Sequence, residues 1–165
     1  MNRRQTQFLV FSTHGERCAL RLEDIAEVME SFAAFPIPNA PPCLIGVINF
    51  HGSPVPVLDL AAFLYGTPPR ASGAILVLDR DIASLALRID AVERILTGDA
   101  PTGPDAEPDG FMGPPVSRDG GDQAFPLLSL ERVVERLDEM LRGRPGGPAR
   151  GALPRPYGVK GTTES

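Results

Sequence analysis

Hydrophobic and polar positions alternate with a period of two over several short stretches of this chain, a pattern typical of half-buried β-strands. The clearest stretch covers residues 44–60, where Gly46 and Gly52 bracket one β-rich run and a second run follows Pro54. The pattern predicts two strands joined by a glycine turn, which is a β-hairpin. Its tip, residues 49–53, is expected to carry recognition, because loops on rigid strands often do.

The same alternation predicts two further hairpins. Residues 7–12 and 17–22 form the first, with Cys18, Leu20 and Leu22 on one face of its second strand. Residues 75–78 and 85–89 form the second, with Leu87 and Ile89 alternating with Arg88. Between them, residues 25–29 have the apolar spacing of one or two helical turns, although their β-branched side chains leave a strand open.

Prolines and glycines separate these elements. Residues 32–42 contain four prolines, which remove backbone donors and favour an extended crossing loop. Residues 61–64 predict a short helix that stops at Gly66, and Asp59 is placed to cap it.

The chain also repeats itself, with an offset of 67 residues. Residues 19–23 align with residues 86–90, Gly46 aligns with Gly113, and residues 56–60 align with residues 126–130 after three extra positions. Two copies of a small β unit are therefore predicted, a first from about 7 to 66 and a second from about 74 to 141. Each copy is small for independent stability, so the two are expected to pack together or to exchange strands.

The second copy departs from the first. Pro114 and Pro115 cannot donate hydrogen bonds to a ladder, so their strand is predicted to be frayed or at an edge. Residues 97–110 are rich in Pro, Gly and Asp and predict a mobile linker. A helix is expected from Ser129 to about Leu141, packing across the second unit, and residues 142–165 predict a disordered tail.

Composition narrows the class of protein. The chain has 165 residues, 42% of them hydrophobic, with a formal net charge of −5 and a pI near 5.0. A buried core is expected, whereas the basic stripe of a nucleic-acid-binding protein is lacking. With no secretory signal core and no run of about 18 apolar residues, a cytoplasmic protein without membrane insertion is expected.

The candidate chemical groups are few. Cys18 and Cys43 are interpreted as buried thiols rather than a disulfide, and with only two histidines no metal site is predicted. Cys18 with His14 is a weak nucleophile–base pair, because a thiol packed on a strand face is inert. His51 with Asp59 is a conceivable base dyad, although a helix cap is the favoured role of Asp59. We therefore expect no catalytic residue, no cofactor and no enzyme activity.

Four segments in order resemble the CheW family of chemotaxis coupling proteins: LVFSTHGERCALRLEDIAEVME, IPNAPPCLIGVINFHGSPVPVLDL, LALRIDAVERIL and FPLLSLERVVERL. The resemblance covers about residues 7–141, and the segment GVIN-x-x-G-x-x-x-PVLDL is its most specific part. It implies a mainly β fold of two intertwined SH3-like five-stranded antiparallel barrels with short helices and a C-terminal helix. It also implies an adaptor that couples the cytoplasmic tips of methyl-accepting chemoreceptors to the regulatory domain of the histidine kinase CheA, at receptor arrays beneath the inner membrane.

The resemblance carries over to individual residues. Glu27 stands at the Glu of the family's V-x-E-[IV] motif, and Gly46, Asn49 and Gly52 stand in its GV-x-N-x-x-G motif, which implies a receptor-binding role. His51 stands where the family typically has Arg, which is a departure from the family. Arg carries a permanent charge, whereas His is mostly neutral at neutral pH. The paired prolines of the second copy and its proline-rich loop also depart from the family.

Two alternatives stay open at this stage. The first is a coupling protein of a non-flagellar chemosensory pathway, for surface motility or second-messenger control. The second, from another class, is a small thiol or histidine hydrolase built on Cys18, His14 and His51.

Overall fold

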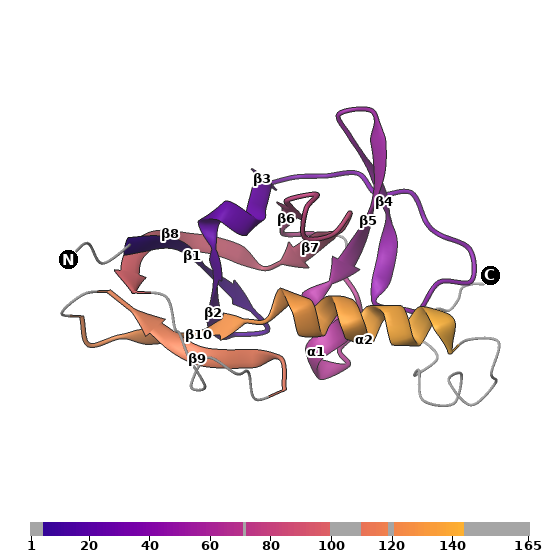
Figure 1. Ribbon diagram of the computed structural model, residues 1–165. Helices are drawn as coiled ribbons and strands as arrows, with labels where there is room; N and C mark the ends of the chain where they lie inside the picture. The colour runs from indigo at the N-terminus through magenta and orange to yellow at the C-terminus, as the bar shows by residue number, and fades with distance from the viewer. Residues whose placement is uncertain (1–4, 71, 100–109, 119–120, 144–165) are drawn as a thin grey trace.

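The chain forms two five-stranded sheets and two α-helices in a computed structural model that describes residues 5–70, 72–99, 110–118 and 121–143 (Figure 1). Sheet 1 has the strand order β8-β1-β2-β10-β9, and sheet 2 has the order β3-β6-β7-β5-β4. The first half of the chain provides β1 (Gln5–Thr13), β2 (Glu16–Arg21), β3 (Ile25–Met29), β4 (Leu44–Phe50), β5 (Ser53–Asp59) and helix α1 (Leu60–Tyr65). The second half provides β6 (Ala74–Leu78), β7 (Ala86–Ile89), β8 (Ala91–Asp99), β9 (Met112–Ser117), β10 (Ala124–Leu128) and helix α2 (Leu130–Arg142).

Each sheet mixes strands from both halves of the chain. The β1–β2 hairpin lies in sheet 1 with β8, β9 and β10, while the β6–β7 hairpin lies in sheet 2 with β3, β4 and β5. The halves join at four strand pairs, of which β1–β8 and β3–β6 are antiparallel and β2–β10 and β5–β7 are parallel. The two halves have therefore exchanged their first hairpins.

Side chains on opposite faces of the strands pack into separate hydrophobic cores. On β1, Phe8 and Val10 point into a small core within sheet 1, while Leu9 and Phe11 point into a large core shared by both sheets. Sheet 2 has its own small core, which includes Val57. The shared core also takes residues from β2, β5, β6, β7, β10 and both helices, among them Leu20, Leu58, Leu60, Leu76, Leu87, Leu128, Val133 and Leu137.

Several elements match their sequence predictions. Asp59 is the N-cap of α1, with a side-chain oxygen accepting from the Ala62 amide, and Gly66 ends that helix with a positive φ of 71°. Ser129 likewise caps α2 and accepts from the Arg132 amide. The strand that holds Pro114 and Pro115, β9, lies at an edge of sheet 1 as predicted.

Other elements differ from their predictions. Residues 25–29, for which the sequence left helix and strand open, form a strand because β3 pairs with β6, which lies about 50 positions later in the chain. The predicted linker starts too early: Thr97, Gly98 and Asp99 belong to β8 and pair with the start of β1. Helix α2 packs on the shared core and so contacts more than the second unit. The predicted mobility of residues 100–109 and disorder of residues 144–165 concern segments outside the described residues.

Candidate functional site

The tip of the β4–β5 hairpin is a tight two-residue turn. His51 and Gly52 both have positive φ angles, 50° and 84°, as the primed turns of two-residue hairpins require. The side-chain oxygen of Asn49 accepts a hydrogen bond from the Gly52 amide at 2.9 Å. The asparagine and glycine of the motif therefore fix the turn, which leaves the His51 side chain at the outermost point.

Glu27 meets His51 at this tip, although the two residues lie on different elements. His51 Nε2 is 3.6 Å from Glu27 Oε1, and the side chains are 74% and 45% exposed. The Phe50 ring lies edge-on to the His51 imidazole, with 4.3 Å between ring centroids. Because Glu27 is on β3 and His51 follows β4, this contact joins the two outermost strands of sheet 2.

Gly46 is buried and lies apart from this exposed corner. A Cβ atom at position 46 would lie 2.6 Å from the Phe35 carbonyl oxygen and 2.9 Å from the Ala34 Cβ. Phe35 exchanges two backbone hydrogen bonds of 2.8 Å with Val47, so the proline-rich crossing is held against the outer edge of β4. Gly46 thus makes room for the crossing segment.

The crossing leaves Phe35 itself strongly exposed, at 69%. Sequence reasoning did not single out this ring, because an apolar residue in a proline-rich loop resembles an ordinary packing contact. Its backbone pairing with Val47 and its exposure together place an aromatic side chain on the edge of sheet 2.

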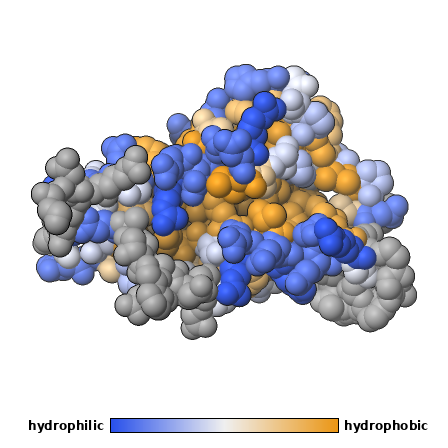
Figure 2. Space-filling model, in the orientation of Figure 1, coloured by the Kyte–Doolittle hydropathy of each residue, from blue (hydrophilic) through white to orange (hydrophobic). Residues whose placement is uncertain are grey.

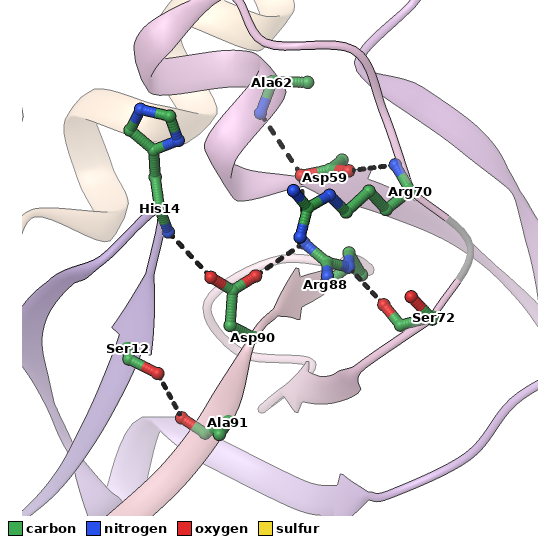
Figure 3. Close-up of polar contacts among 9 residues, drawn as sticks. All are labelled: Ser12, His14, Asp59, Ala62, Arg70, Ser72, Arg88, Asp90 and Ala91. Carbon is green, nitrogen blue, oxygen red and sulfur yellow. Dashed lines mark hydrogen bonds and ion pairs between the residues drawn. The ribbon is translucent and has the colours of Figure 1, made fainter.

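A second cluster surrounds the buried guanidinium of Arg88 on β7 (Figure 3). Arg88 Nη1 lies 3.1 Å from Asp90 Oδ1 and 3.6 Å from Asp59 Oδ1, as ion pairs rather than aligned hydrogen bonds. Arg88 Nε donates to the Ser72 carbonyl. Asp59 accepts from the amides of Ala62 at 3.2 Å and Arg70 at 2.6 Å.

This Arg88 cluster connects the two sheets. Asp90 Oδ2 accepts a hydrogen bond of 2.9 Å from the His14 amide in the β1–β2 turn, and the His14 ring stacks on Tyr65 at the end of α1. A cavity of about 490 Å³ is lined by His14, Asp59, Arg88 and Asp90. The sequence indicated the capping role of Asp59 but gave no sign that Arg88 would be buried with it.

The catalytic alternatives receive no support from these positions. Asp59 lies at the far end of β5 from His51, and six residue steps of a strand span about 20 Å, so the two form no dyad. Cys18 is buried, and burial raises its thiol pKa to about 12. The Cys43 thiol is also buried, with its pKa raised to about 11 by the same cause. Such thiols are poor nucleophiles.

The described residues hold neither a metal-ligand cluster nor a helix that could span a membrane. Within the described ranges, no group of three or more His, Cys, Asp or Glu side chains is arranged to hold a metal ion. No helix in that same part of the chain has the length and apolar character to cross a membrane.

Comparison with known proteins assigns the family. The model of the CheW-like domain matches residues 7–138, which includes both sheets, the hairpin tip and most of α2. The chain belongs to the CheW-like domain family.

The relatives are distant. A "Probable chemotaxis protein CheW" of Rhizobium etli is 29% identical over 59% of this chain and 64% of its own length. "Chemotaxis protein CheW" of Rhizobium meliloti is 28% identical over 55% of this chain and 60% of its own. The chain thus spans less than two thirds of these two relatives. "Protein FrzA" of Myxococcus xanthus is 27% identical over 81% of this chain and 88% of its own.

A solved structure supports the fold. The scaffolding protein TtCheW of Thermoanaerobacter tengcongensis superimposes with a TM-score of 0.60, covering 74% of this chain and 88% of that protein at 24% sequence identity. The predicted mainly β, CheW-like fold is confirmed by this match and by the two five-stranded sheets.

Proposed function

We propose that this CheW-like chain is a non-enzymatic chemotaxis adaptor that holds a chemoreceptor cytoplasmic tip and the regulatory domain of the kinase CheA together. Its place in the cell is at receptor arrays on the cytoplasmic side of the inner membrane. Membership of the family supports the proposal, as do two relatives whose names describe chemotaxis proteins and a fold neighbour described as a scaffold.

The observation that carries the proposal is the exposed corner where Glu27 meets the hairpin tip. The hydrogen bond between Asn49 and the Gly52 amide holds the backbone of the turn, which lowers the cost of ordering the hairpin tip on binding. A carboxylate beside an ionisable ring, next to the exposed edge of β3, suits a helical receptor tip that carries complementary polar side chains. In this proposal Gly46 acts indirectly, by fixing the route of the crossing segment.

A binding experiment tests the proposal. The full chain is mixed with a purified receptor-tip fragment, or with a CheA regulatory domain, from the same genome, and each mixture is analysed by size-exclusion chromatography and calorimetry. We expect complexes with both partners, and loss of receptor binding alone in Glu27→Ala. Glu16→Ala, which removes an exposed carboxylate at the start of β2 in sheet 1, is the matched control. Absence of both complexes contradicts the adaptor function, and equal loss in both variants contradicts the assigned corner.

A further inference from the structure

A groove separates the first two turns of α2 from the β6–β7 turn and the end of β2. It has a volume of about 620 Å³ and contains none of the five predicted receptor-site residues. Its apolar lining includes Ile82, Leu128 and Val134. Figure 2 shows hydrophobic surface gathered between α2 and the strands beside it, with hydrophilic surface on either side.

The rim of this groove is acidic. Asp24 and Asp81 lie on one side, and Glu131 and Glu135 of α2 lie on the other. Among the described residues, none of these four carboxylates forms an ion pair. Arg21 and Arg132 also line the groove, which leaves a net negative rim. An apolar floor with an acidic rim fits a basic segment with apolar side chains.

The chain contains such a segment directly after α2. Residues 144–165 carry Arg144, Arg150, Arg155 and Lys160 against a single acidic residue, Glu164, although the chain as a whole has a charge of −5. Leu153, Tyr157 and Val159 provide apolar side chains between the basic positions.

The segment is also long enough to reach the groove. Helix α2 has 13 residues and is therefore about 20 Å long. A segment as long as residues 144–165 spans at most roughly 70 Å, which is enough to reach from the end of α2 to its first turns. A short tether of this kind gives the segment a high effective concentration at the groove.

We propose that residues 144–165 bind in cis in the acidic groove between α2 and the β6–β7 turn. A protein partner that uses this groove then has to displace the segment, which makes the groove a regulated surface. Because the rim and the segment are opposite in charge, the contact weakens as salt is raised.

Paramagnetic labelling of the full chain tests this proposal. A nitroxide is attached to Cys in the variant Ala152→Cys, and the native Cys18 and Cys43 stay unlabelled because both are buried. We expect the amide signals of Ile82, Glu131 and Val134 to lose most of their intensity, and to recover at about 0.5 M salt. The loss is also expected to disappear in the doubly neutralised groove, Asp81→Asn with Glu135→Gln.

The matched control neutralises two exposed carboxylates outside the groove, Glu16→Gln with Glu30→Gln, and is expected to keep the loss of signal. No loss at the groove residues overturns the proposal, as does a loss that persists in the neutralised groove. A loss of the same size between a labelled chain and a separate isotope-enriched chain overturns binding in cis and assigns the contact to two copies.

Discussion

At the scale of single residues, the buried charges of Arg88 and Asp59 are the features most sensitive to change. Their side chains are 3% and 1% exposed, so each depends on the other and on Asp90 for compensation. A buried charge left alone costs far more than an exposed ion pair contributes. The Arg88 cluster is therefore a structural link between the sheets.

Replacing Arg88 with Met is expected to lower the free energy of unfolding by about 3–5 kcal/mol, because Asp59 then stays buried without its ion pair. Urea unfolding followed by circular dichroism measures the change. Arg17→Met is the control, since the exposed Arg17–Glu93 pair contributes at most about 1 kcal/mol. A smaller effect for Arg88→Met than for Arg17→Met would disprove a stabilising role for the cluster.

Burial of the two cysteines leads to a prediction about their reactivity and about the pH dependence of stability. With a pKa near 12, the folded Cys18 thiol is ionised in about one molecule in ten thousand at pH 8, so a disulfide reagent is expected to react with neither cysteine until urea unfolds the chain. The folded-state pKa lies above the ordinary thiol value of 9.0, so the contribution of the protonated Cys18 thiol to stability is fully present below pH 9 and is lost progressively between pH 9 and about 12. Rapid reaction of native protein at pH 8 would contradict this burial.

His51 provides the residue-scale test of the proposed receptor site. His51→Arg places a permanent charge beside Glu27 and is expected to strengthen binding of a receptor-tip fragment about three- to fivefold near pH 7.5. Calorimetry measures the effect, with His14→Arg as control. Unchanged or weaker binding by His51→Arg would show that the receptor is recognised through other contacts.

At the scale of elements, local patterns predicted the hairpins because alternation and turn residues act within a few positions. The hairpin at residues 44–60, both helix caps and the edge position of β9 follow from such short-range rules. Residues 25–29 were ambiguous because their conformation depends on pairing with β6. The composition of residues 97–99 favours a loop, but pairing with β1 makes them part of a strand.

The candidate site shows the same division between local and distant causes. The turn at Asn49 and Gly52 is readable from the sequence, since both residues act within the hairpin. Burial of Arg88 is not readable from the sequence, because two of its three partners, Asp59 and Ser72, lie 16 or more positions away along the chain. The alternation of Arg88 with Leu87 and Ile89 predicts which face of the strand Arg88 lies on, but it does not predict which residues pack against that face.

Helix α2 permits a comparison of two leucines on one stripe. Leu137 packs into the shared core, whereas Leu141 is 42% exposed. Leu137→Ala is expected to lower the free energy of unfolding by about 2–5 kcal/mol, whereas Leu141→Ala is expected to change it by at most about 0.5 kcal/mol. Because both variants replace Leu with Ala in the same helix, the difference between their unfolding free energies in urea reports the packing of Leu137. Equal effects would indicate that α2 does not anchor the core.

At the scale of the whole molecule, the exchange of hairpins decides how the chain holds together. Neither sheet is built from one continuous half: sheet 1 needs β1 and β2 from the first half, and sheet 2 needs β6 and β7 from the second. The shared core then buries one face of the inner strands of both sheets. A surface on either sheet is therefore supported by both halves.

This arrangement predicts a single cooperative unfolding transition. Opening either sheet removes strands that the other half requires, and it exposes the shared core of both. Amides in β2 and β7, the middle strands of sheets 1 and 2, are expected to exchange hydrogen with the same free energy of opening, equal to that from urea unfolding. Arg88→Met is expected to lower both values together, although Arg88 lies in sheet 2 alone. If β7 became less protected while β2 kept its original protection, the sheets would be independent units and the shared core would not couple them.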